Sequence, residues 1–369
     1  MMNINFEASA KNIISLLQEQ ENVAIVIKGS PDPDAIASSY FFWKLCALLH
    51  VKAVLFGFMP ASLPSNKEFI SVFNIPLRIV ENIKVIDLKK YSGYIVCDYQ
   101  TAVLEDNYSA TPCIIHLDHH SPAEHDVPAR FRILTDEVSS TSTLCALLMQ
   151  HISIVSLEKD ISNIATALYV GIKTDSDDFK HVNEYDTMAL EYIKPFCNMA
   201  LIEHIENTPL TPYALSLLQK AMNNAIVYKD WLIAGVGFVE ERYRDTIAII
   251  ADYLLQTNTV ELVVVYGAVY HNNHTKLDID ASFRTKNEDF DLNELIKNIT
   301  TDGGGRKYKG AFQVHIDYFV HCPDQDKLWE IIQITTDQIL KNQRESSLKI
   351  ALQSKFKKMK NILKHLFRL

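Results

Sequence analysis

The triplet Asp118-His119-His120 offers the most concentrated chemistry in this sequence. The apolar run Cys113-Ile114-Ile115 precedes it and Ser121-Pro122 follows it, which predicts a short buried strand ending at the triplet. Side chains at such a strand end lie where open α/β sheets bind ligands. One carboxylate and two imidazoles on one loop can hold a metal ion and transfer protons. A solvated turn is the alternative interpretation, so the triplet needs support from elsewhere in the chain.

Four further aspartates supply that support. Each directly follows a predicted apolar element: Asp32 and Asp34 come after the strand 23–27, Asp98 after the strand 94–97, and Asp175 after the helix 161–172. Because the carboxyl ends of parallel strands share one edge of a sheet, we expect these carboxylates to meet the histidines there. Hard carboxylates with one or two imidazoles suit Mn²⁺ or Mg²⁺. Two such ions about 3.5–4 Å apart can activate water against a phosphate ester.

Two groups of polar residues also have simpler interpretations. Asp34 precedes a helix expected over residues 35–49, so its carboxylate could serve only as the N-cap. The hydroxyl run Ser139 to Thr143 precedes a predicted apolar helix, and its members could likewise be caps. A helix N-terminus also attracts phosphate, which makes this run a secondary candidate for substrate contact.

Composition limits the class of protein. The chain has 369 residues, 48% of them hydrophobic, and a net charge of −9, which argues against a general nucleic-acid coat or a membrane-surface protein. The six cysteines show no CxxC or zinc spacing, and several lie in apolar runs, so we interpret them as small buried side chains. No signal peptide or membrane-spanning stretch is recognised. We therefore expect a cytoplasmic protein without stable membrane insertion.

The chain is expected to form two α/β domains. Strands alternate with helices through residues 20–180, which predicts a mostly parallel sheet. The proline-containing stretch Thr208 to Pro212 is the best linker. We predict a metal-binding catalytic domain at residues 1–207, followed by a linker at residues 208–217. A smaller α/β domain with a mixed sheet, at residues 218–335, is expected to bind substrate. A basic helical tail is expected at residues 340–369.

The second predicted domain carries groups suited to anions. An alternating strand, residues 276–284, ends at Arg284, and a glycine-rich loop at residues 302–310 contains Arg306, Lys307 and Lys309. Adjacent glycines let backbone N–H groups approach an anion, and the cations add charge. A flexible connector is the alternative, but the cations favour an anion-binding loop.

The tail from Lys341 to Leu369 differs in charge from the rest of the chain. It has nine basic residues and one acid, with apolar residues at three- or four-residue steps, which predicts a basic amphipathic helix. We favour docking of this helix on the protein's own acidic body. Binding to an RNA strand or an anionic surface is the alternative.

Together these motifs resemble the DHH/DHHA1 phosphoesterase family, which includes RecJ-like exonucleases, NrnA-type nano-RNases that also hydrolyse adenosine 3′,5′-bisphosphate, and family II inorganic pyrophosphatases. The resemblance covers residues from about 20 to 320. The matching segments occur in the family's order: residues 31–38, Cys97-Asp98, Asp118-His119-His120, residues 171–175, Arg284, and Gly303-Gly304-Gly305 with Arg306.

The resemblance implies a metal centre of one or two Mn²⁺ or Mg²⁺ ions. In it, Asp98 would bridge two ions and Asp32 would bind the first. The second ion would be bound by Asp34, His119 and Asp175.

The resemblance also implies how substrate is held. His120 would contact the scissile phosphate, and Asp118 would hold the histidine loop through hydrogen bonds. From the second domain, Arg284 and the loop 303–309 would close over the substrate, which places the site between the domains.

Two positions depart from the family pattern. Lys28 stands where nano-RNases and pyrophosphatases have a histidine ligand, and an ammonium has no lone pair for a metal. We expect Lys28 to pair with Asp32 and to weaken the first metal position, or to replace that ion's charge in catalysis. Arg306 stands where nano-RNases tend to have histidine, which suggests a different substrate end group.

The sequence therefore predicts a metal-dependent phosphoesterase, a hydrolase of phosphomonoester or phosphodiester bonds. Short single-stranded oligonucleotides or small phosphorylated nucleotides are the expected substrates, and a homodimer is compatible with the sequence. The alternative is a catalytically weak sensor that binds nucleotide or nucleic acid, because Lys28 replaces a metal ligand.

Overall fold

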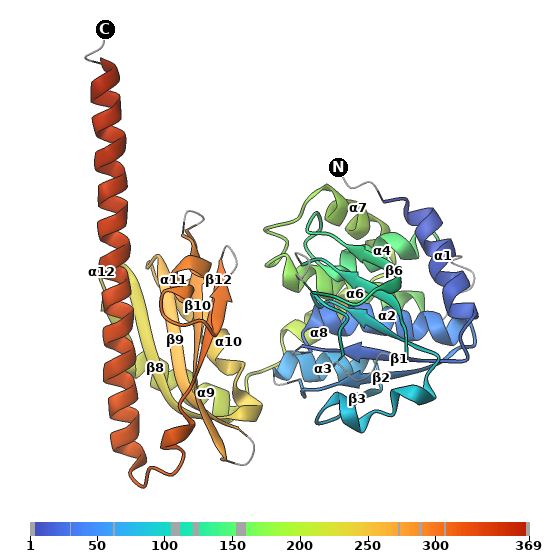
Figure 1. Ribbon diagram of the computed structural model, residues 1–369, viewed down its shortest axis with the longest axis horizontal. Helices are drawn as coiled ribbons and strands as arrows, with labels where there is room; N and C mark the ends of the chain where they lie inside the picture. Colours follow the sequence, from blue (N-terminus) through green and yellow to red (C-terminus); the bar gives the residue numbers. More distant parts are fainter. Residues whose placement is uncertain are drawn as a thin grey trace. The chain divides into compact units, whose positions relative to one another are not determined.

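The computed structural model describes residues 4–29, 31–61, 63–104, 111–120, 125–152, 160–271, 274–287, 290–305 and 308–366, and from residue 347 onward it describes the backbone alone. The chain separates into two compact units, Met1–Pro209 and Leu210–Leu369 (Figure 1). Their boundary lies in the proline-containing stretch after Asn207, and the predicted linker overlaps the start of helix α9 (Pro212–Asn224).

The first unit is built on a parallel sheet of six strands in the order β3-β2-β1-β4-β5-β6. The predicted mostly parallel sheet is therefore confirmed. Its strands are β1 (Asn22–Ile27), β2 (Lys52–Gly57), β3 (Leu77–Ile79), β4 (Gly93–Cys97), β5 (Cys113–Asp118) and β6 (Ala129–Leu134).

The central strands of this sheet are covered on both faces. Val23, Ile25 and Ile27 of β1 pack in one apolar cluster with helices, while Ala24 and Val26 pack in a second cluster on the opposite face. This explains why β1 reads as a continuous apolar run rather than an alternating one. The helices are α1 (Phe6–Gln18), α2 (Pro33–Leu48), α3 (Pro64–Val72), α4 (Thr141–Met149), α6 (Ile161–Asp175), α7 (Glu184–Ile193) and α8 (Met199–Glu206).

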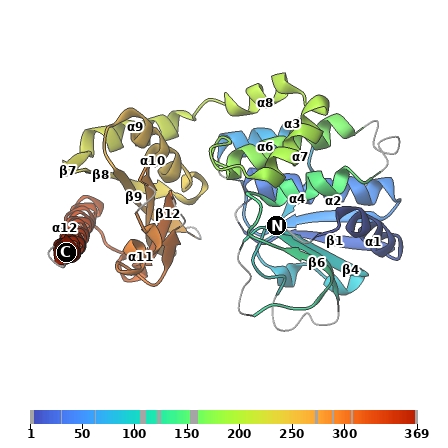
Figure 2. The ribbon, with the colours of Figure 1, turned by 90° about the horizontal axis from the view of Figure 1, so that it is seen from above.

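Helices α2, α4 and α6 pack together over one face of the sheet, as Figure 2 shows from above. On the opposite face the apolar cluster includes the short 3₁₀ turns Ile83–Val85 and Leu88–Lys90. The helices thus start or end at the edge of the sheet where β4 and β5 also end, which brings their terminal side chains to one place.

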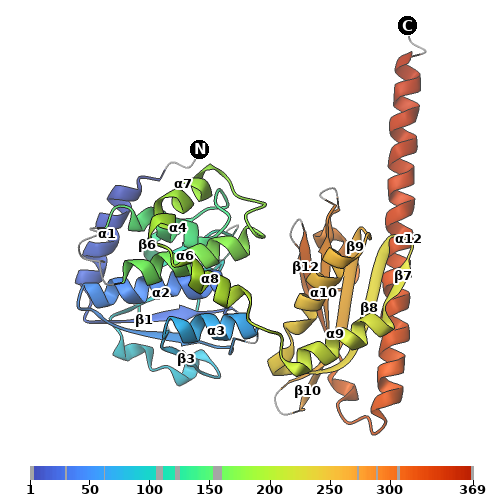
Figure 3. The same ribbon diagram turned by 180° about the vertical axis from the view of Figure 1, so that it is seen from behind.

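The second unit contains a mixed sheet in the order β11-β12-β10-β9-β8-β7. Strands β8 and β9 are parallel and the other pairs are antiparallel, which confirms the predicted mixed sheet. Its strands are β7 (Ile226–Tyr228), β8 (Trp231–Glu240), β9 (Leu262–His271), β10 (Lys276–Thr285), β11 (Gly303–Gly305) and β12 (Lys309–His315). Figure 3 shows helices α9, α10 (Thr246–Thr257) and α12 (Gln325–Leu366) beside the sheet. Helices α9 and α10 share one apolar cluster with the sheet, and α11 (Leu292–Lys297) shares another with α12.

The glycine run is an edge strand rather than the predicted loop. Gly303, Gly304 and Gly305 pair with β12 as β11. A Cβ atom added at Gly303 would lie 2.7 Å from Phe312 Cβ, and one at Gly310 would lie 2.4 Å from Ile296 Cδ1. The glycines are therefore explained first by close packing of β11, β12 and α11.

The C-terminal helix α12 is continuous over 42 residues, so the predicted helical tail is confirmed. Its first half docks on the sheet of the second unit, where Tyr266 donates a 2.7 Å hydrogen bond to Asp337 and Arg344 pairs with Asp230. Docking of the basic residues beyond Ser346 stays a prediction. A bilayer-spanning helix, which needs about 20 apolar residues, does not occur among the described elements.

Gly171 allows α6 to approach α4 and α2 closely. A Cβ atom at this position would lie 2.2 Å from Ser142 Oγ and 3.3 Å from the Cα atom of Asp34. Alanine would raise intrinsic helix stability by roughly 0.5–1 kcal/mol, but the clash opposes this gain.

We expect Gly171→Ala to lower the free energy of unfolding by about 1–3 kcal/mol, because α6 must move away from α4. Urea denaturation measures the change. Gly29→Ala is the matched control, because its Cβ would make only ordinary contacts, 3.5 Å from Tyr99. Equal stability of the two variants would contradict the proposed close packing.

Candidate metal centre

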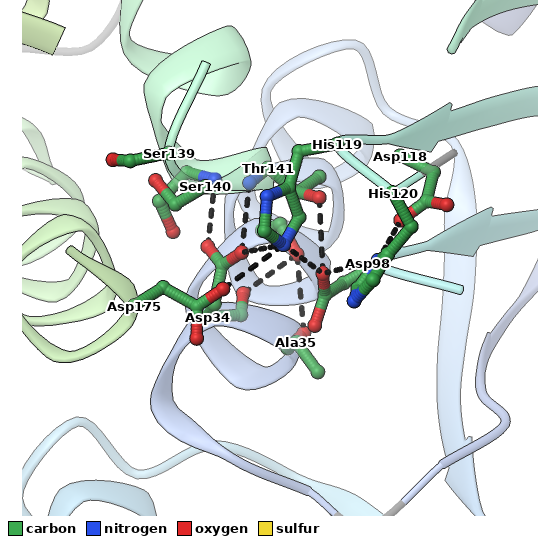
Figure 4. A network of polar contacts seen from close by, with 12 residues as sticks. Asp34, Ala35, Asp98, Asp118, His119, His120, Ser139, Ser140, Thr141 and Asp175 are labelled. Atoms are coloured by element: carbon green, nitrogen blue, oxygen red, sulfur yellow. Dashed lines mark hydrogen bonds and ion pairs between the residues drawn. The ribbon is translucent and has the colours of Figure 1, made fainter. Parts of the chain in front are cut away.

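Three carboxylates gather around one imidazole nitrogen at the carboxyl edge of the parallel sheet. His119 Nε2 lies 2.9 Å from Asp175 Oδ2, 3.4 Å from Asp98 Oδ1 and 4.0 Å from Asp34 Oδ2. Figure 4 shows the three side chains turned toward His119. Asp34, His119 and Asp175 each offer a ligand atom within 4.8 Å of the others, and so do Asp98, His119 and His120. The donor set of carboxylates and imidazole fits Mn²⁺ or Mg²⁺.

Asp98 reaches this cluster from an unusual backbone conformation. It follows β4 with φ 56°, in the left-handed region that few residues other than glycine adopt. Its N–H donates a 2.9 Å hydrogen bond to the Leu117 carbonyl, and Thr141 Oγ1 donates to its carboxylate at 3.2 Å. Backbone strain of this kind, held by neighbouring contacts, is typical of functional sites.

Asp34 has a different capping role from the one considered from sequence. The N-cap of α2 is Asp32, which accepts a 2.9 Å hydrogen bond from the Ala35 N–H. Asp34 is fully buried, and its two oxygens accept the N–H groups of Thr141 and Ser142, both at 2.7 Å. It therefore caps the start of α4 from α2 and remains beside His119.

The electrostatics of the cluster favour a bound cation. Burial, with the nearby charges of Asp175 and Asp34, raises the pKa of Asp32 to about 7. Burial and neighbouring carboxylates likewise raise the pKa values of Asp34 and Asp98. Like charges gathered in a low-dielectric edge are unfavourable unless they bind protons or a metal.

Asp118 positions His120. It is the last residue of β5, its side chain is buried, and its Oδ1 lies 2.7 Å from His120 Nδ1. This contact fixes which ring nitrogen of His120 faces the strand, as carboxylates behind metal-site histidines commonly do. The same Nδ1 lies 3.8 Å from Asp98 Oδ1.

Lys28 lies elsewhere than expected. Its ammonium donates to the carbonyl of Thr101 at 2.7 Å and to that of Val103, and it lies 4.5 Å from the centre of the Tyr99 ring. Among the described ion pairs it has none with Asp32, so the expected pairing is wrong. The carbonyls satisfy the ammonium instead, and burial lowers the pKa of Lys28 to about 8.

Sequence reasoning missed two supporting residues. Asp186 of α7 accepts hydrogen bonds from the Ser139 N–H at 3.0 Å and from Thr143 Oγ1 at 2.7 Å, and so holds the start of α4. His116 is buried within β5 and contacts the Tyr99 carbonyl at 2.8 Å. The sequence did contain a signal for His116, which is a histidine inside an otherwise apolar run. It contained no local signal for Asp186.

The remaining predicted residues belong to the second unit. Arg284 Nε donates to Asp252 Oδ1 at 2.7 Å, and its Nη1 donates to the Phe283 carbonyl at 3.0 Å. Gly303, Gly304 and Gly305 form β11, as described above. Arg306 lies outside the described residues. The predicted contacts of these residues with substrate stay predictions.

Comparison with known proteins agrees with this geometry. Residues 22–172 match the model of the DHH family N-terminal domain. The N-terminal part of the chain is therefore similar to the DHH family. The matched segment contains Asp32, Asp34, Asp98 and the Asp118-His119-His120 triplet, and it ends three residues before Asp175.

The individual proteins that this chain resembles are more distant. An uncharacterised protein of Methanocaldococcus jannaschii is 29% identical over 307 residues, which cover 82% of this chain and 60% of that protein's length. The fold resembles an exopolyphosphatase-related protein of Bacteroides fragilis, with a TM-score of 0.68 and 16% identity over 93% of this chain and 99% of that one. It also resembles RecJ of Thermus thermophilus in complex with Mn²⁺, with a TM-score of 0.50 and 10% identity over 89% of this chain and 55% of that one.

The raised aspartate pKa values predict how pH acts on the metal-free protein. Between about pH 4, near the ordinary aspartate pKa, and about pH 7, the folded state binds more protons than the unfolded state. Stability should therefore fall as pH rises from 5 to 8, on the order of 2 kcal/mol or roughly 4–8 °C in Tm. Thermal melting in EDTA measures the fall.

Mn²⁺ should reverse this loss at pH 8, because the ion replaces the protons. Asp98→Asn is the matched variant, since one fewer buried acid gives a shallower pH dependence and a smaller response to Mn²⁺. A wild-type Tm that stays level or rises between pH 5 and 8 in EDTA would show that the carboxylates are not coupled in this way.

Proposed function

We propose that this chain, whose N-terminal part resembles the DHH family, is a metal-dependent phosphoesterase acting on short oligonucleotides or small phosphorylated nucleotides. The observation that carries the proposal is the convergence of Asp34, Asp98 and Asp175 on His119. Phosphoester hydrolysis needs a counter-charge for the phosphate and an activated water, and a cluster of hard ligands can hold the cation that supplies both.

In this proposal the described groups divide into two ligand positions. Asp34, His119 and Asp175 hold one ion, and Asp98 lies close enough to His119 to serve both positions. Asp32 completes the other position from the N-cap of α2. Bound there, Mn²⁺ or Mg²⁺ would acidify the attacking water and offset the negative charge of the phosphate.

The protein's own groups orient the reaction. Asp118 holds His120 in one orientation beside the cluster, so that its imidazole can bind the phosphate or exchange a proton with it. Thr141 Oγ1 holds the carboxylate of Asp98. These contacts keep the ligand geometry in place before substrate arrives, which lowers the cost of organising it during the reaction.

The environment of Lys28 refines the proposal for the first ligand position. Its ammonium is engaged by two carbonyls, so it neither neutralises Asp32 nor replaces an imidazole ligand. We infer that the first position binds its ion more weakly than the second and completes its coordination with water. Millimolar rather than micromolar Mn²⁺ should then be needed for full activity.

The nucleotide preference is supported by charge in the second unit. Arg284 of β10 and Lys309 of β12 are cross-strand partners, and β11 continues the same sheet. Two cations on neighbouring strands, one of them paired with Asp252, suit a phosphate or a terminal nucleotide better than a long duplex.

The second candidate is a nucleotide-binding sensor with little turnover. Lys28 favours it, because a missing imidazole ligand at the first position would impair two-ion chemistry more than binding. The two candidates differ in whether the wild-type protein hydrolyses substrate when Mn²⁺ is saturating.

The test uses purified protein, saturating Mn²⁺, and three substrates: a labelled trinucleotide, adenosine 3′,5′-bisphosphate and bis-(4-nitrophenyl) phosphate. We expect hydrolysis by wild type, and a decrease in kcat/KM of roughly 10³-fold or more in Asp98→Asn, because a ligand shared by both positions is lost. Asp87→Asn, on a surface 3₁₀ turn, is the control and should keep wild-type activity. Activity that survives both Asp98→Asn and EDTA would refute the proposal.

Lys28→His distinguishes the enzyme from the sensor. Restoring an imidazole should lower the Mn²⁺ concentration needed for half-maximal activity by about 10-fold, because the first position gains a ligand. An inactive wild type beside an active Lys28→His variant would establish the sensor. If both proteins bind Mn²⁺ and neither cleaves any of the three substrates, the phosphoesterase proposal fails.

A further inference from the structure

A second group of metal-ligating side chains lies within the C-terminal unit. His271 ends β9, and Asp278 and Asp280 lie on β10. Each offers a ligand atom, and these atoms all lie within 4.8 Å of one another. Asp278 is 3% exposed and Asp280 is 5% exposed, so the carboxylates are not an ordinary solvated surface.

Strand geometry places these side chains on one face. Asp278 and Asp280 are two residues apart, and successive even positions of a strand point to the same side. The antiparallel register sets Asp278 opposite His315 of β12 and places His271 opposite Lys276, at the same end of the sheet. His271 Nε2 lies 3.0 Å from Asp278 Oδ2, and His315 Nδ1 lies 2.6 Å from Asp278 Oδ1.

The protein leaves this cluster incompletely satisfied. Arg244 pairs with Asp280 through Oδ2, but the buried Oδ1 of Asp280 has no hydrogen-bond partner. Burial raises the pKa of Asp280 despite the nearby guanidinium. A buried acceptor without a partner is destabilising, and a ligand bound there would remove that cost.

The charges nearby also favour a cation. A third carboxylate, that of Glu241, lies near Asp278 and Asp280, with its Oε1 3.1 Å from His271 Nδ1. Within this group, Arg244 pairs with Asp280. The contact with Glu241 engages one ring nitrogen of His271 while the other faces Asp278. This arrangement of a carboxylate behind a histidine is the usual support of a metal-binding imidazole.

We propose that His271, Asp278 and Asp280 form a second divalent-metal site, and that His315, now 2.6 Å from Asp278 Oδ1, turns to become a fourth ligand when the ion binds. Two imidazoles, two carboxylates and no thiolate suit Zn²⁺ or a similar first-row transition ion better than Mg²⁺. The site differs in this respect from the centre around His119, where carboxylates outnumber imidazoles.

The bound ion would have a structural effect. Its ligands come from β9, β10 and β12, and Glu241 begins the 3₁₀ turn before α10. One ion would therefore link three strands directly, and it would connect to that turn through the contact between His271 and Glu241. Binding should raise the thermal stability of the second unit and release any proton held between His315 and Asp278.

The test measures binding of Zn²⁺, and of Co²⁺ as a spectroscopic probe, to the full chain in an Asp98→Asn background that impairs the first centre. We expect one equivalent of Zn²⁺ to remain bound after dialysis, with visible Co²⁺ absorption and a higher Tm. Adding His271→Ala should weaken Zn²⁺ binding by at least about 100-fold and remove the Tm increase, since a ligand is lost.

Two controls keep the outcome decisive. His321→Ala, at an exposed histidine of the same unit, should leave binding unchanged. His315→Gln keeps a hydrogen-bond donor near Asp278 at an exposed position, and should weaken binding by about 10-fold even if His271→Ala fails to fold. No bound Zn²⁺ in the Asp98→Asn background, or binding unchanged by both His271→Ala and His315→Gln, would overturn the proposal.

Discussion

The first unit depends on one electrostatic constraint, which is that several carboxylates are held together at a buried sheet edge around a single imidazole. Separated in water, these acids would ionise near pH 4, whereas burial and mutual repulsion raise their pKa values here. Contacts between helices that are distant in sequence support this arrangement. Asp34 caps α4 across the interior, and Asp186 holds the same helix start from α7.

The packing of the helices follows from the same constraint. Asp34 can reach the N–H groups of α4 only if α2, α4 and α6 lie close together, and Gly171 permits that approach. A side chain at this glycine would push on Ser142, whose N–H binds Asp34. The geometry of the carboxylate cluster and the stability of the helical layer are therefore not independent, because the same few contacts determine both.

Much of this was available in the sequence, for physical reasons that differ between elements. Buried parallel strands read as apolar runs, so β1, β4 and β5 and the acids after them were recognisable. Contacts across the fold left no local pattern. The pairing of Asp34 with α4 and of Asp186 with Thr143 joins residues far apart in sequence. The position of the Lys28 ammonium was predicted wrongly, because it donates hydrogen bonds to two carbonyls from another segment of the chain.

The glycine run shows a further limit of reading motifs. Its composition indicated a loop, because adjacent glycines permit many backbone conformations. In the structure the same glycines are required by close contact, since side chains at Gly303 and Gly310 would overlap Phe312 and Ile296. The glycines of this edge strand are half-buried, and the Gly305 N–H donates a 3.3 Å hydrogen bond to Asn293 Oδ1. Close packing and the predicted anion binding would both require glycine at these positions, so composition alone cannot distinguish them.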